Sequence, residues 1–536
     1  MNREAVTLIH QSIDESASRD PSHEAFRFDG RALTYEQLVV RANRLARVLV
    51  DEGVRPGDRV GIYMTKGIEL PVALYGALKA GAAYVPIDPA APPARARFIV
   101  EDCGVRHLIT SASRERRALA LANDVPAVCA VIGAQAGSDE TRYRTIPWEA
   151  VDAADVRPPD VAVADQDLAY IMYTSGSTGV PKGLMHTHAS GLSYATRSAQ
   201  TYGVDPTDRL GNHSPLHFDM STFEYLTGPL RGATTVIIPE ETTLFPVSLG
   251  ELIERERLTF WYSVPLALIQ LVTRGEIERR DASSLRWVLF GGEPFQPKYL
   301  WRLMELWPRA RFSNVYGPAE VNQCTHYHVQ RSDIGSNEPI PIGTPWADAE
   351  CLVVEADDTP VPKGEAGELL VRTPTMMQGY WARPDLNRTA FFREDALPGP
   401  ARMFYRTGDL VREREDGQLL FLGRKDRQIK VRGYRVELDE IESVLASLEE
   451  VAEAAAVACR DEEGHVTIVA AVLLRGQEHL SADSIRRRAS ERLPPYAVPE
   501  RVDIRSSFPR TPTGKTDRRA LANMYGPGGR GILERT

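Results

Sequence analysis

Hydrophobic and polar positions follow helical and extended spacing in turn along the first part of the chain. One helix is predicted to begin after Thr34, which forms a capping-box pattern with Gln37, and to end at Gly53. Its apolar residues fall on one face, at Leu38, Ala42, Leu45 and Leu49. An extended run at 58–64, a helical segment at 69–81 and a second extended run at 83–88 follow. This alternation predicts βαβ units and a largely parallel sheet.

The pattern continues and then changes. Extended apolar runs at 234–239, 258–264 and 285–292 prolong the α/β alternation. After about residue 345, short strands separated by glycine turns predict a small barrel or sandwich, as at 367–374. From about residue 426 a helix, two strands and an arginine-rich helix predict a mixed α+β region.

Length and composition narrow the class of protein. The 536 residues exceed one compact core, so several domains are expected. A net charge of −9 argues against general nucleic-acid binding, and no apolar run approaches the ~20 residues of a membrane span. The start has no apolar signal core, and the five cysteines show no paired motif. We therefore expect a cytoplasmic protein without a membrane or nucleic-acid partner.

A loop rich in glycine, serine and threonine lies at 173–183, and its residues suit phosphate binding. It is not the P-loop of nucleotide hydrolases, G-x-x-x-x-G-K-[ST]. Five residues after Gly176 stands Pro181 instead of glycine, and Lys182 is followed by Gly183 instead of a hydroxyl that could bind magnesium. Taken alone, the loop is better interpreted as a solvated turn.

Six further motifs follow this loop in order. They are FDMSTFE at 218–224, NVYGPAE at 314–320, GELLVR at 367–372, YRTGDL at 405–410, GRKDRQIKVRGYRVEL at 423–438 and PRTPTGKTDRRAL at 509–521. Together they resemble the core motifs of the adenylate-forming (ANL) superfamily, in particular the stand-alone amino-acid adenylation enzymes of nonribosomal peptide synthesis. The resemblance covers about residues 8–521.

The resemblance implies an α/β fold with a hinge. A large N-terminal domain of two αβ-layered subdomains plus a small β-barrel is expected at 1–425, as the core that binds ATP and the amino acid. A small, mobile α+β C-terminal domain is expected at 426–523, followed by a flexible tail at 524–536. Asp426 takes the family's hinge position, about which the C-terminal domain rotates between two half-reactions.

The resemblance also implies a two-step reaction. An amino-acid carboxylate attacks the α-phosphorus of ATP and gives an aminoacyl adenylate and pyrophosphate. The phosphopantetheine thiol of a carrier protein then displaces AMP. ATP and Mg²⁺ are the implied cofactors, and Glu320 resembles the carboxylate that holds the metal. No carrier segment follows Lys515, so we expect a separate carrier protein as partner.

Further roles are implied residue by residue. The loop is expected to cover the β- and γ-phosphates through Thr174, Ser175, Gly176, Ser177, Thr178 and Gly179. Lys182 would stabilise the departing pyrophosphate, and Lys515 resembles the mobile lysine that bridges the substrate carboxylate and the α-phosphate. Either lysine, taken alone, would be a surface residue. Ala319 departs from the family, which usually has a threonine there to contact the α-phosphate.

The adenosine site is implied by two motifs. Tyr316 resembles the aromatic residue that stacks on adenine, with Asn314 and Gly317 beside it. Asp409 resembles the carboxylate that accepts hydrogen bonds from both ribose hydroxyls, and Arg424 would add a donor near the ribose.

The substrate class depends on Asp219. An aspartate at this position pairs with the α-ammonium group in amino-acid-activating members, because a cation in a closed pocket needs a counter-charge. A helix N-cap is the alternative interpretation. The other implied pocket residues are Met220, Phe223, Tyr262, Leu289, Gly291, Val315, Gln323 and Cys324. Two of these residues, Phe223 and Tyr262, are large and most of the others are apolar, so a small, mostly apolar substrate is expected. Gln323 could bind a polar atom or hydrogen-bond Tyr262.

This pocket is similar to that of the free-standing L-proline adenylating enzymes that begin pyrrole biosynthesis. Gly291, Gln323 and Met220 depart somewhat from that pattern, so a substituted proline, another small amino acid or a β-amino acid stays open. Two other classes are also open. An acyl- or aryl-CoA ligase of the same superfamily is disfavoured by Asp219, and a non-catalytic adenylate-binding relative is disfavoured by the retained lysines and carboxylates.

Overall fold

The computed structural model describes residues 6–135, 142–176, 180–335, 339–394, 401–460, 465–475, 480–511 and 516–525. The predicted helix after Thr34 is confirmed as α2 (Tyr35–Asp51), with both hydrogen bonds of the capping box present. Leu38, Ala42, Leu45 and Leu49 are all buried on its inner face. The local pattern therefore placed this helix and its buried face correctly.

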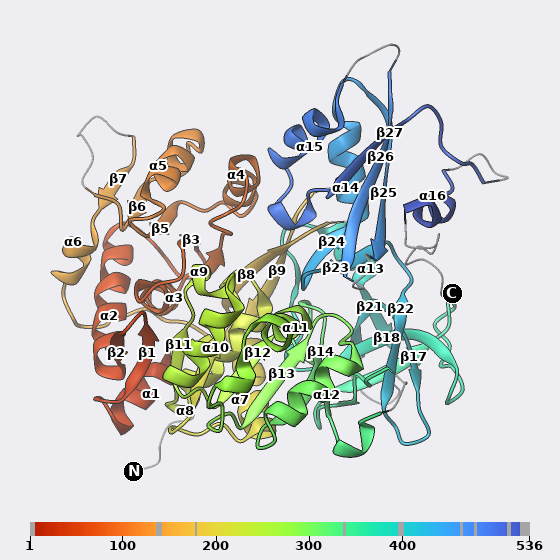
Figure 1. Cartoon of the computed structure of the whole chain (residues 1–536). Coiled ribbons are helices and arrows are strands. Elements are labelled where there is room, and N and C mark those ends of the chain that lie inside the picture. Colours follow the sequence, from red (N-terminus) through yellow and green to blue (C-terminus); the bar gives the residue numbers. More distant parts are fainter. Residues whose placement is uncertain are drawn as a thin grey trace.

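The first sheet contains the predicted βαβ units (Figure 1). Strands β4, β3, β5, β6 and β7 lie side by side in this order and are parallel. Strands β8 and β9 form an antiparallel hairpin beside β4. In spatial order they are β19 (Gly379–Tyr380), β9 (Lys182–Thr187), β8 (Leu168–Thr174), β4 (Ala83–Pro86), β3 (Arg59–Tyr63), β5 (His107–Thr110), β6 (Ala130–Ile132) and β7 (Arg144–Ile146).

Helices cover both faces of this sheet. Alternate residues of a strand therefore lie in two different cores. Ile109 lies in the core with α2 and α3, and its neighbour Leu108 lies in the core with α4 and α5. Burial on both faces explains why these strands are continuous apolar runs in the sequence. The helices of this half are α1 (Gln11–Arg19), α3 (Glu69–Lys79), α4 (Pro93–Asp102), α5 (Glu115–Asp124) and α6 (Trp148–Asp152).

The second sheet holds the substrate side of the molecule. In the spatial order given below, neighbouring strands from β14 to β1 are parallel. At one end β2 pairs antiparallel with β1, and at the other end β15 and β16 pair antiparallel with β14 and with each other. In spatial order its strands are β16 (Thr344–Pro345), β15 (Thr325–His328), β14 (Arg311–Tyr316), β13 (Trp287–Gly291), β12 (Phe260–Ser263), β10 (Arg209–Asn212), β11 (Thr234–Ile237), β1 (Glu24–Phe28) and β2 (Arg31–Thr34).

Two cores again lie on opposite faces of this second sheet. Trp261 and Val288 enter the core with α10–α12, whereas Tyr262 and Leu289 enter the core with α7. The helices are α7 (His188–Tyr202), α8 (Gly228–Arg231), α9 (Glu240–Thr243), α10 (Pro246–Arg255), α11 (Pro265–Arg274) and α12 (Pro297–Leu306).

The third sheet contains the short strands that the glycine-rich pattern predicted, and they pair antiparallel. Its order is β17 (Glu350–Val354), β18 (Ala366–Arg372), β21 (Arg402–Glu413) and β20 (Phe391–Glu394), with β22 (Leu419–Arg424) also on β21 and α13 (Pro384–Ala390) nearby. The two ends of this order, β17 and β20, are not paired within the described residues. The strand pairing is therefore that of an open sheet and not of the expected closed barrel.

The α+β pattern predicted after residue 426 is confirmed. The hairpin β23 (Gln428–Val431) and β24 (Tyr434–Glu437) is followed by a sheet of β25 (Val451–Arg460), β26 (Val466–Leu474) and β27 (Arg501–Arg505), with α14 (Leu438–Ala446), α15 (Ala482–Ser490) and α16 (Arg518–Tyr525). Helix α16 continues past residue 524, where a tail was expected, and the Tyr525 hydroxyl donates to Asp503.

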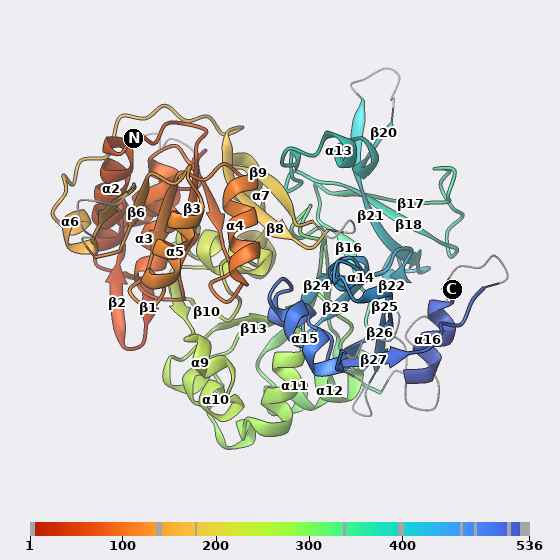
Figure 2. The same ribbon diagram turned by 90° about the horizontal axis from the view of Figure 1, so that it is seen from above.

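Figure 2 shows the β23–β24 hairpin near the middle of the molecule, among elements of the other sheets. No helix within the described ranges is both long enough and apolar enough to cross a membrane.

Candidate active site

The Gly/Ser/Thr loop connects the antiparallel strands β8 and β9, where Thr174 pairs with Lys182. Gly176 is required there, because a Cβ atom would lie 2.0 Å from the carbonyl oxygen of Val180. The Thr174 hydroxyl is buried with no hydrogen-bond partner among the described residues. The predicted phosphate contacts Ser177, Thr178 and Gly179 lie outside the described residues.

Lys182 points from the end of this loop toward Glu320. Its Nζ lies 3.6 Å from Glu320 Oε1 and donates a hydrogen bond of 3.2 Å to the Tyr380 hydroxyl. Burial, together with the nearby Arg435, lowers the pKa of Lys182 to about 8. The structure thus brings two residues predicted from separate motifs into contact.

Glu320 has no exposed surface and is surrounded by donors. The Tyr380 hydroxyl donates to Oε1 at 2.8 Å, and Arg435 Nη1 lies 2.8 Å from each carboxylate oxygen. Burial opposes ionisation, but Arg435 and Lys182 outweigh it and hold the pKa of Glu320 well below its usual range. Sequence reasoning gave no role to Tyr380 or Arg435.

At this site the protein would supply one carboxylate ligand to magnesium, that of Glu320, and not a full set of protein ligands. No group of three or more His, Cys, Asp or Glu side chains within the described part of the chain could hold a metal ion. Mg²⁺ commonly uses one or two protein carboxylates and completes its shell with water and substrate phosphates. Glu320, beside the phosphate loop, fits that kind of site.

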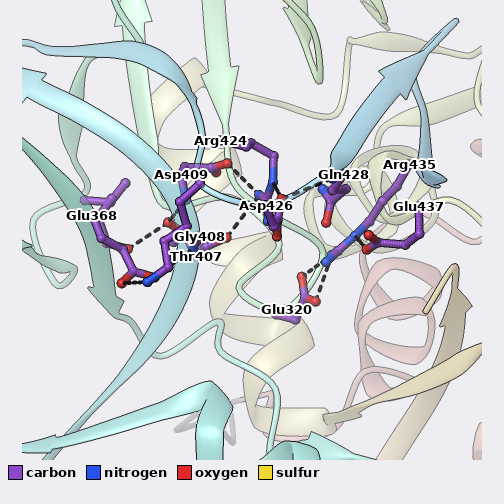
Figure 3. Close-up of polar contacts among 12 residues, drawn as sticks. Glu320, Glu368, Thr407, Gly408, Asp409, Arg424, Asp426, Gln428, Arg435 and Glu437 are labelled. Atoms are coloured by element: carbon purple, nitrogen blue, oxygen red, sulfur yellow. Dashed lines mark hydrogen bonds and ion pairs between the residues drawn. The ribbon is translucent and has the colours of Figure 1, made fainter. Parts of the chain in front are cut away.

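Tyr316, Asp409, Arg424 and Asp426 form one chain of contacts. Figure 3 shows the part of this chain from Asp409 through Arg424 to Asp426. The Tyr316 hydroxyl donates to Asp409 Oδ2, and Arg424 Nη1 donates to Asp409 Oδ1 at 2.6 Å. Arg424 also donates from Nε and Nη2 to the two oxygens of Asp426, at 2.6 Å each. The predicted ribose carboxylate and the predicted hinge residue are therefore joined by one arginine.

Burial raises the pKa of Asp409, although Arg424 and Tyr316 act in the opposite direction.

Asn314 and Gly317 serve the local fold in this structure. The Asn314 amide donates to the carbonyl of Pro341 at 2.8 Å, and a Cβ at Gly317 would lie 2.1 Å from the Asn322 carbonyl oxygen. Ala319, where the family has threonine, offers its carbonyl oxygen 3.1 Å from His186 Nε2.

The predicted substrate pocket is brought together on one face of the second sheet. Met220, Phe223, Tyr262, Leu289 and Val315 belong to a single buried cluster. Phe223 and Tyr262 meet edge to face with ring centroids 5.8 Å apart.

Gly291 pairs with Val315 of this cluster across the sheet, whereas Cys324 belongs to a different buried cluster. Gly291 cannot carry a side chain, since its Cβ would lie 2.2 Å from the Val315 carbonyl oxygen. Cys324 is fully buried in the adjoining core with Tyr380 and Tyr405.

Gln323 differs from the expectation. Its amide nitrogen donates to the Tyr202 hydroxyl at 3.1 Å and not to Tyr262. Tyr202 comes from α7 and packs against both Phe223 and Trp287. Because Tyr202 and Gln323 are 121 residues apart in the sequence, no local pattern indicated this contact.

Asp219 begins a short 3₁₀ turn beside the pocket. Its Oδ1 accepts from the next backbone N–H, that of Met220, at 3.0 Å, and no side-chain cap of the following turns is present. Burial raises the pKa of Asp219, and the charge that most opposes this shift is the ammonium group of Lys430. The N-cap interpretation is therefore not supported, and the fold provides a half-buried carboxylate beside the pocket.

Lys515 lies outside the described residues. The residues on either side are bound on the C-terminal domain itself, where Arg510 and Thr516 both contact Glu453 of β25. In this structure the β23–β24 hairpin of the C-terminal domain contacts Glu320 through Arg435.

Comparison with known proteins agrees with this arrangement. The family model of the AMP-binding enzymes matches residues 13–381, and that of the AMP-binding enzyme C-terminal domain matches residues 440–515. The chain belongs to the AMP-binding enzymes. It is an adenylating ligase.

Its curated relatives include carrier-protein ligases and peptide synthetases. The chain is 34% identical to an L-proline–[L-prolyl-carrier protein] ligase of Pseudomonas fluorescens, over 97% of this chain and 99% of the relative. The corresponding ligase of Streptomyces coelicolor is 35% identical, over 91% of each chain. Gramicidin S synthase 2 of Brevibacillus brevis is 33% identical over 96% of this chain, which is 11% of that protein.

Solved structures share the fold of these AMP-binding enzymes. The amide bond synthetase McbA of Marinactinospora thermotolerans has a TM-score of 0.85 at 25% identity, covering 97% of this chain and all of that one. The adenylation domain AlmE of Vibrio cholerae, solved with glycyl-adenosine-5′-phosphate, has a TM-score of 0.82 at 25% identity, covering 97% and 98%.

Proposed function

We propose that this enzyme activates a small amino acid as its adenylate and loads it onto the phosphopantetheine thiol of a separate carrier protein. The observation that carries the proposal is the half-buried carboxylate of Asp219 beside an apolar pocket. Lys430 supplies part of the positive charge that a carboxylate taken out of water requires, and a cationic ligand group in the pocket would supply the rest. An α-ammonium group supplies that charge, and fatty or aryl acids do not.

The proposed substrate is L-proline or a close analogue. Phe223, Tyr262 and Tyr202 fill much of the cluster, which favours a compact apolar side chain. A secondary ammonium group still offers two donors to Asp219. The full-length similarity to L-proline–[L-prolyl-carrier protein] ligases supports the same choice.

The remaining residues take roles in two half-reactions. Lys182 and the loop would hold the β- and γ-phosphates, and Asp409 the ribose hydroxyls. Magnesium, when bound at Glu320 and the phosphates, would neutralise charge on the leaving pyrophosphate. Lys515 would stand between the substrate carboxylate and the α-phosphate during adenylation.

We infer that the present domain orientation belongs to the second half-reaction. Arg510 and Thr516, which lie on either side of Lys515 in the sequence, bind Glu453 of β25, and Arg435 of the β23–β24 hairpin binds Glu320. Rotation about Asp426 would exchange the two segments.

Amino-acid-dependent ATP–pyrophosphate exchange tests the proposal. A panel of small, aromatic, charged, aryl and fatty acids should give its highest exchange rate with L-proline or an analogue. The adenylate should then be transferred to an added phosphopantetheinylated carrier protein and not to coenzyme A. Exchange with aryl or fatty acids alone would contradict the amino-acid assignment. A larger aromatic or acidic amino acid that exceeds proline would contradict the pocket interpretation and leave the enzyme class intact.

A further inference from the structure

The C-terminal domain places a positive charge inside the proposed phosphate and metal site. Arg435 in β24 directs one guanidinium nitrogen to both oxygens of Glu320, at 2.8 Å each (Figure 3). The side chain of Arg435 is only 11% exposed and that of Glu320 is not exposed at all. A buried contact of this kind is a strong charge-assisted interaction, and it engages both oxygens of the Glu320 carboxylate on the side that faces Arg435.

Neighbouring groups complete the enclosure. The Ser175 hydroxyl, in the phosphate loop, donates to the backbone carbonyl of Arg435 at 2.6 Å. Lys182 lies 3.6 Å from Glu320, and Tyr380 donates to it. A divalent cation brought to Glu320 would therefore lie close to two other cations, which is electrostatically unfavourable. Arg435 must withdraw before a metal ion can use this carboxylate.

Other contacts hold the C-terminal domain in the same orientation. Arg95 of α4 and Glu440 of α14 form a buried ion pair of 2.7 Å across the two domains. Phe218 and Tyr434 meet edge to face at 4.7 Å. Gly433 is pressed against Val264, where a Cβ would approach within 2.2 Å. The approach of Arg435 to Glu320 is thus part of a defined docked state.

We propose that Arg435 makes this docked orientation and the binding of magnesium–ATP mutually exclusive, because its guanidinium takes the place of the divalent cation at Glu320. The inference builds on the proposed function of Glu320 and the loop. It gives the reaction an order. The hairpin docks after the metal and pyrophosphate have left, and the docked domain prevents a second ATP from entering before the aminoacyl group has been transferred.

Linkage makes the proposal measurable on the unreacted protein. A ligand that binds only the undocked state has an apparent affinity equal to its intrinsic affinity multiplied by the fraction of molecules in that state. By reciprocity, magnesium–ATP must promote undocking of the hairpin. Weakening the contact between Arg435 and Glu320 should therefore tighten the binding of the magnesium complex of ATP.

The experiment compares Arg435→Gln with Arg432→Gln. Arg432 lies in the turn of the same hairpin and pairs with Glu500 of its own domain, so its variant removes a charge without touching the site. Binding of α,β-methylene-ATP is measured by calorimetry, without amino acid, in magnesium and in EDTA. We expect Arg435→Gln to bind the magnesium complex about tenfold more tightly than wild type, with no gain in EDTA. Arg432→Gln should match wild type in both.

Hydrogen–deuterium exchange of residues 428–437 supplies a second readout that needs no variant. In the wild-type protein, exchange in this hairpin should rise when the magnesium complex of the analogue is added. In Arg435→Gln it should be raised before any addition. Equal affinities of Arg435→Gln and Arg432→Gln in magnesium, or unchanged wild-type exchange on adding the analogue, would overturn the proposal.

Wild-type ATP–pyrophosphate exchange separates this inference from the proposed function. Exchange with amino acids but no effect of Arg435 contradicts only the exclusion mechanism. A clear effect of Arg435 without amino-acid-dependent exchange contradicts only the substrate assignment.

Discussion

Asp219→Asn separates the charge of this side chain from its local hydrogen bond. An asparagine oxygen can still accept from the Met220 N–H, 3.0 Å away in the wild-type structure, and the side-chain volume is nearly unchanged. What is lost is the negative charge that would pair with the substrate ammonium group. The 3₁₀ turn should therefore persist while substrate recognition fails.

The size of the effect follows from burial. A carboxylate–ammonium contact of about 3 Å at an effective dielectric constant of about 20 is worth about 5 kcal/mol. Leaving one member of a buried pair without its partner costs roughly 3 to 5 kcal/mol. That corresponds to a loss of about 150- to 5,000-fold in kcat/KM for the amino acid.

The assay is ATP–pyrophosphate exchange with the amino acid and ATP varied separately. The KM for ATP should change by less than about twofold, because Asp219 does not belong to the phosphate or ribose contacts. Ser221→Ala is the matched control. Ser221 lies in the same turn, and its hydroxyl donates a hydrogen bond of 2.6 Å to the Phe218 carbonyl but carries no charge. If Asp219→Asn retains exchange within about threefold of wild type, the counter-charge interpretation is wrong.

Two further predictions concern the hinge motion and the stability of the fold. Lys515→Ala should nearly abolish pyrophosphate exchange but spare thioester formation from a chemically supplied adenylate; near-normal exchange would refute its assigned role. Burial lowers the pKa of His188 from 6.5 to about 4, and its Nδ1 accepts from the Ile9 N–H. The unfolded chain therefore binds more protons between these pH values, and the free energy of unfolding should fall by up to roughly 3 kcal/mol as the pH drops from 6.5 to 4. Denaturant titration should show this loss to be smaller in His188→Asn, which keeps an acceptor that does not titrate, and equal losses would contradict the prediction.

The regular elements were accessible from the sequence where their causes are local. Helix α2 is an example, because its cap and its apolar stripe lie within one short segment. The glycine-rich region after residue 345 was predicted correctly as short strands, but the expected closure of these strands into a barrel was not found among the described residues. Whether β17 meets β20 depends on pairing between segments far apart in the chain, which no local pattern encodes.

The site shows the same division. Motif resemblance named Lys182, Glu320 and Asp409, and the fold brings Lys182 to Glu320 from separate strands and loops. Tyr380 gave no signal, although it donates to Glu320. Arg435 lay inside a motif already singled out, but its partner belongs to the other domain, so its contact could be found only in three dimensions.

The sequence by itself determined the alternation of helices and strands, the position of the Gly/Ser/Thr loop and the set of charged residues available for chemistry. These depend on spacing, capping and glycine positions within short segments. Only the tertiary structure decided that Gln323 bonds Tyr202, that Arg424 joins Asp409 to Asp426 and that Arg435 occupies Glu320. Each of these contacts joins side chains whose proximity is set by sheet packing and by domain orientation, and the same charges in another orientation of the C-terminal domain would pair differently.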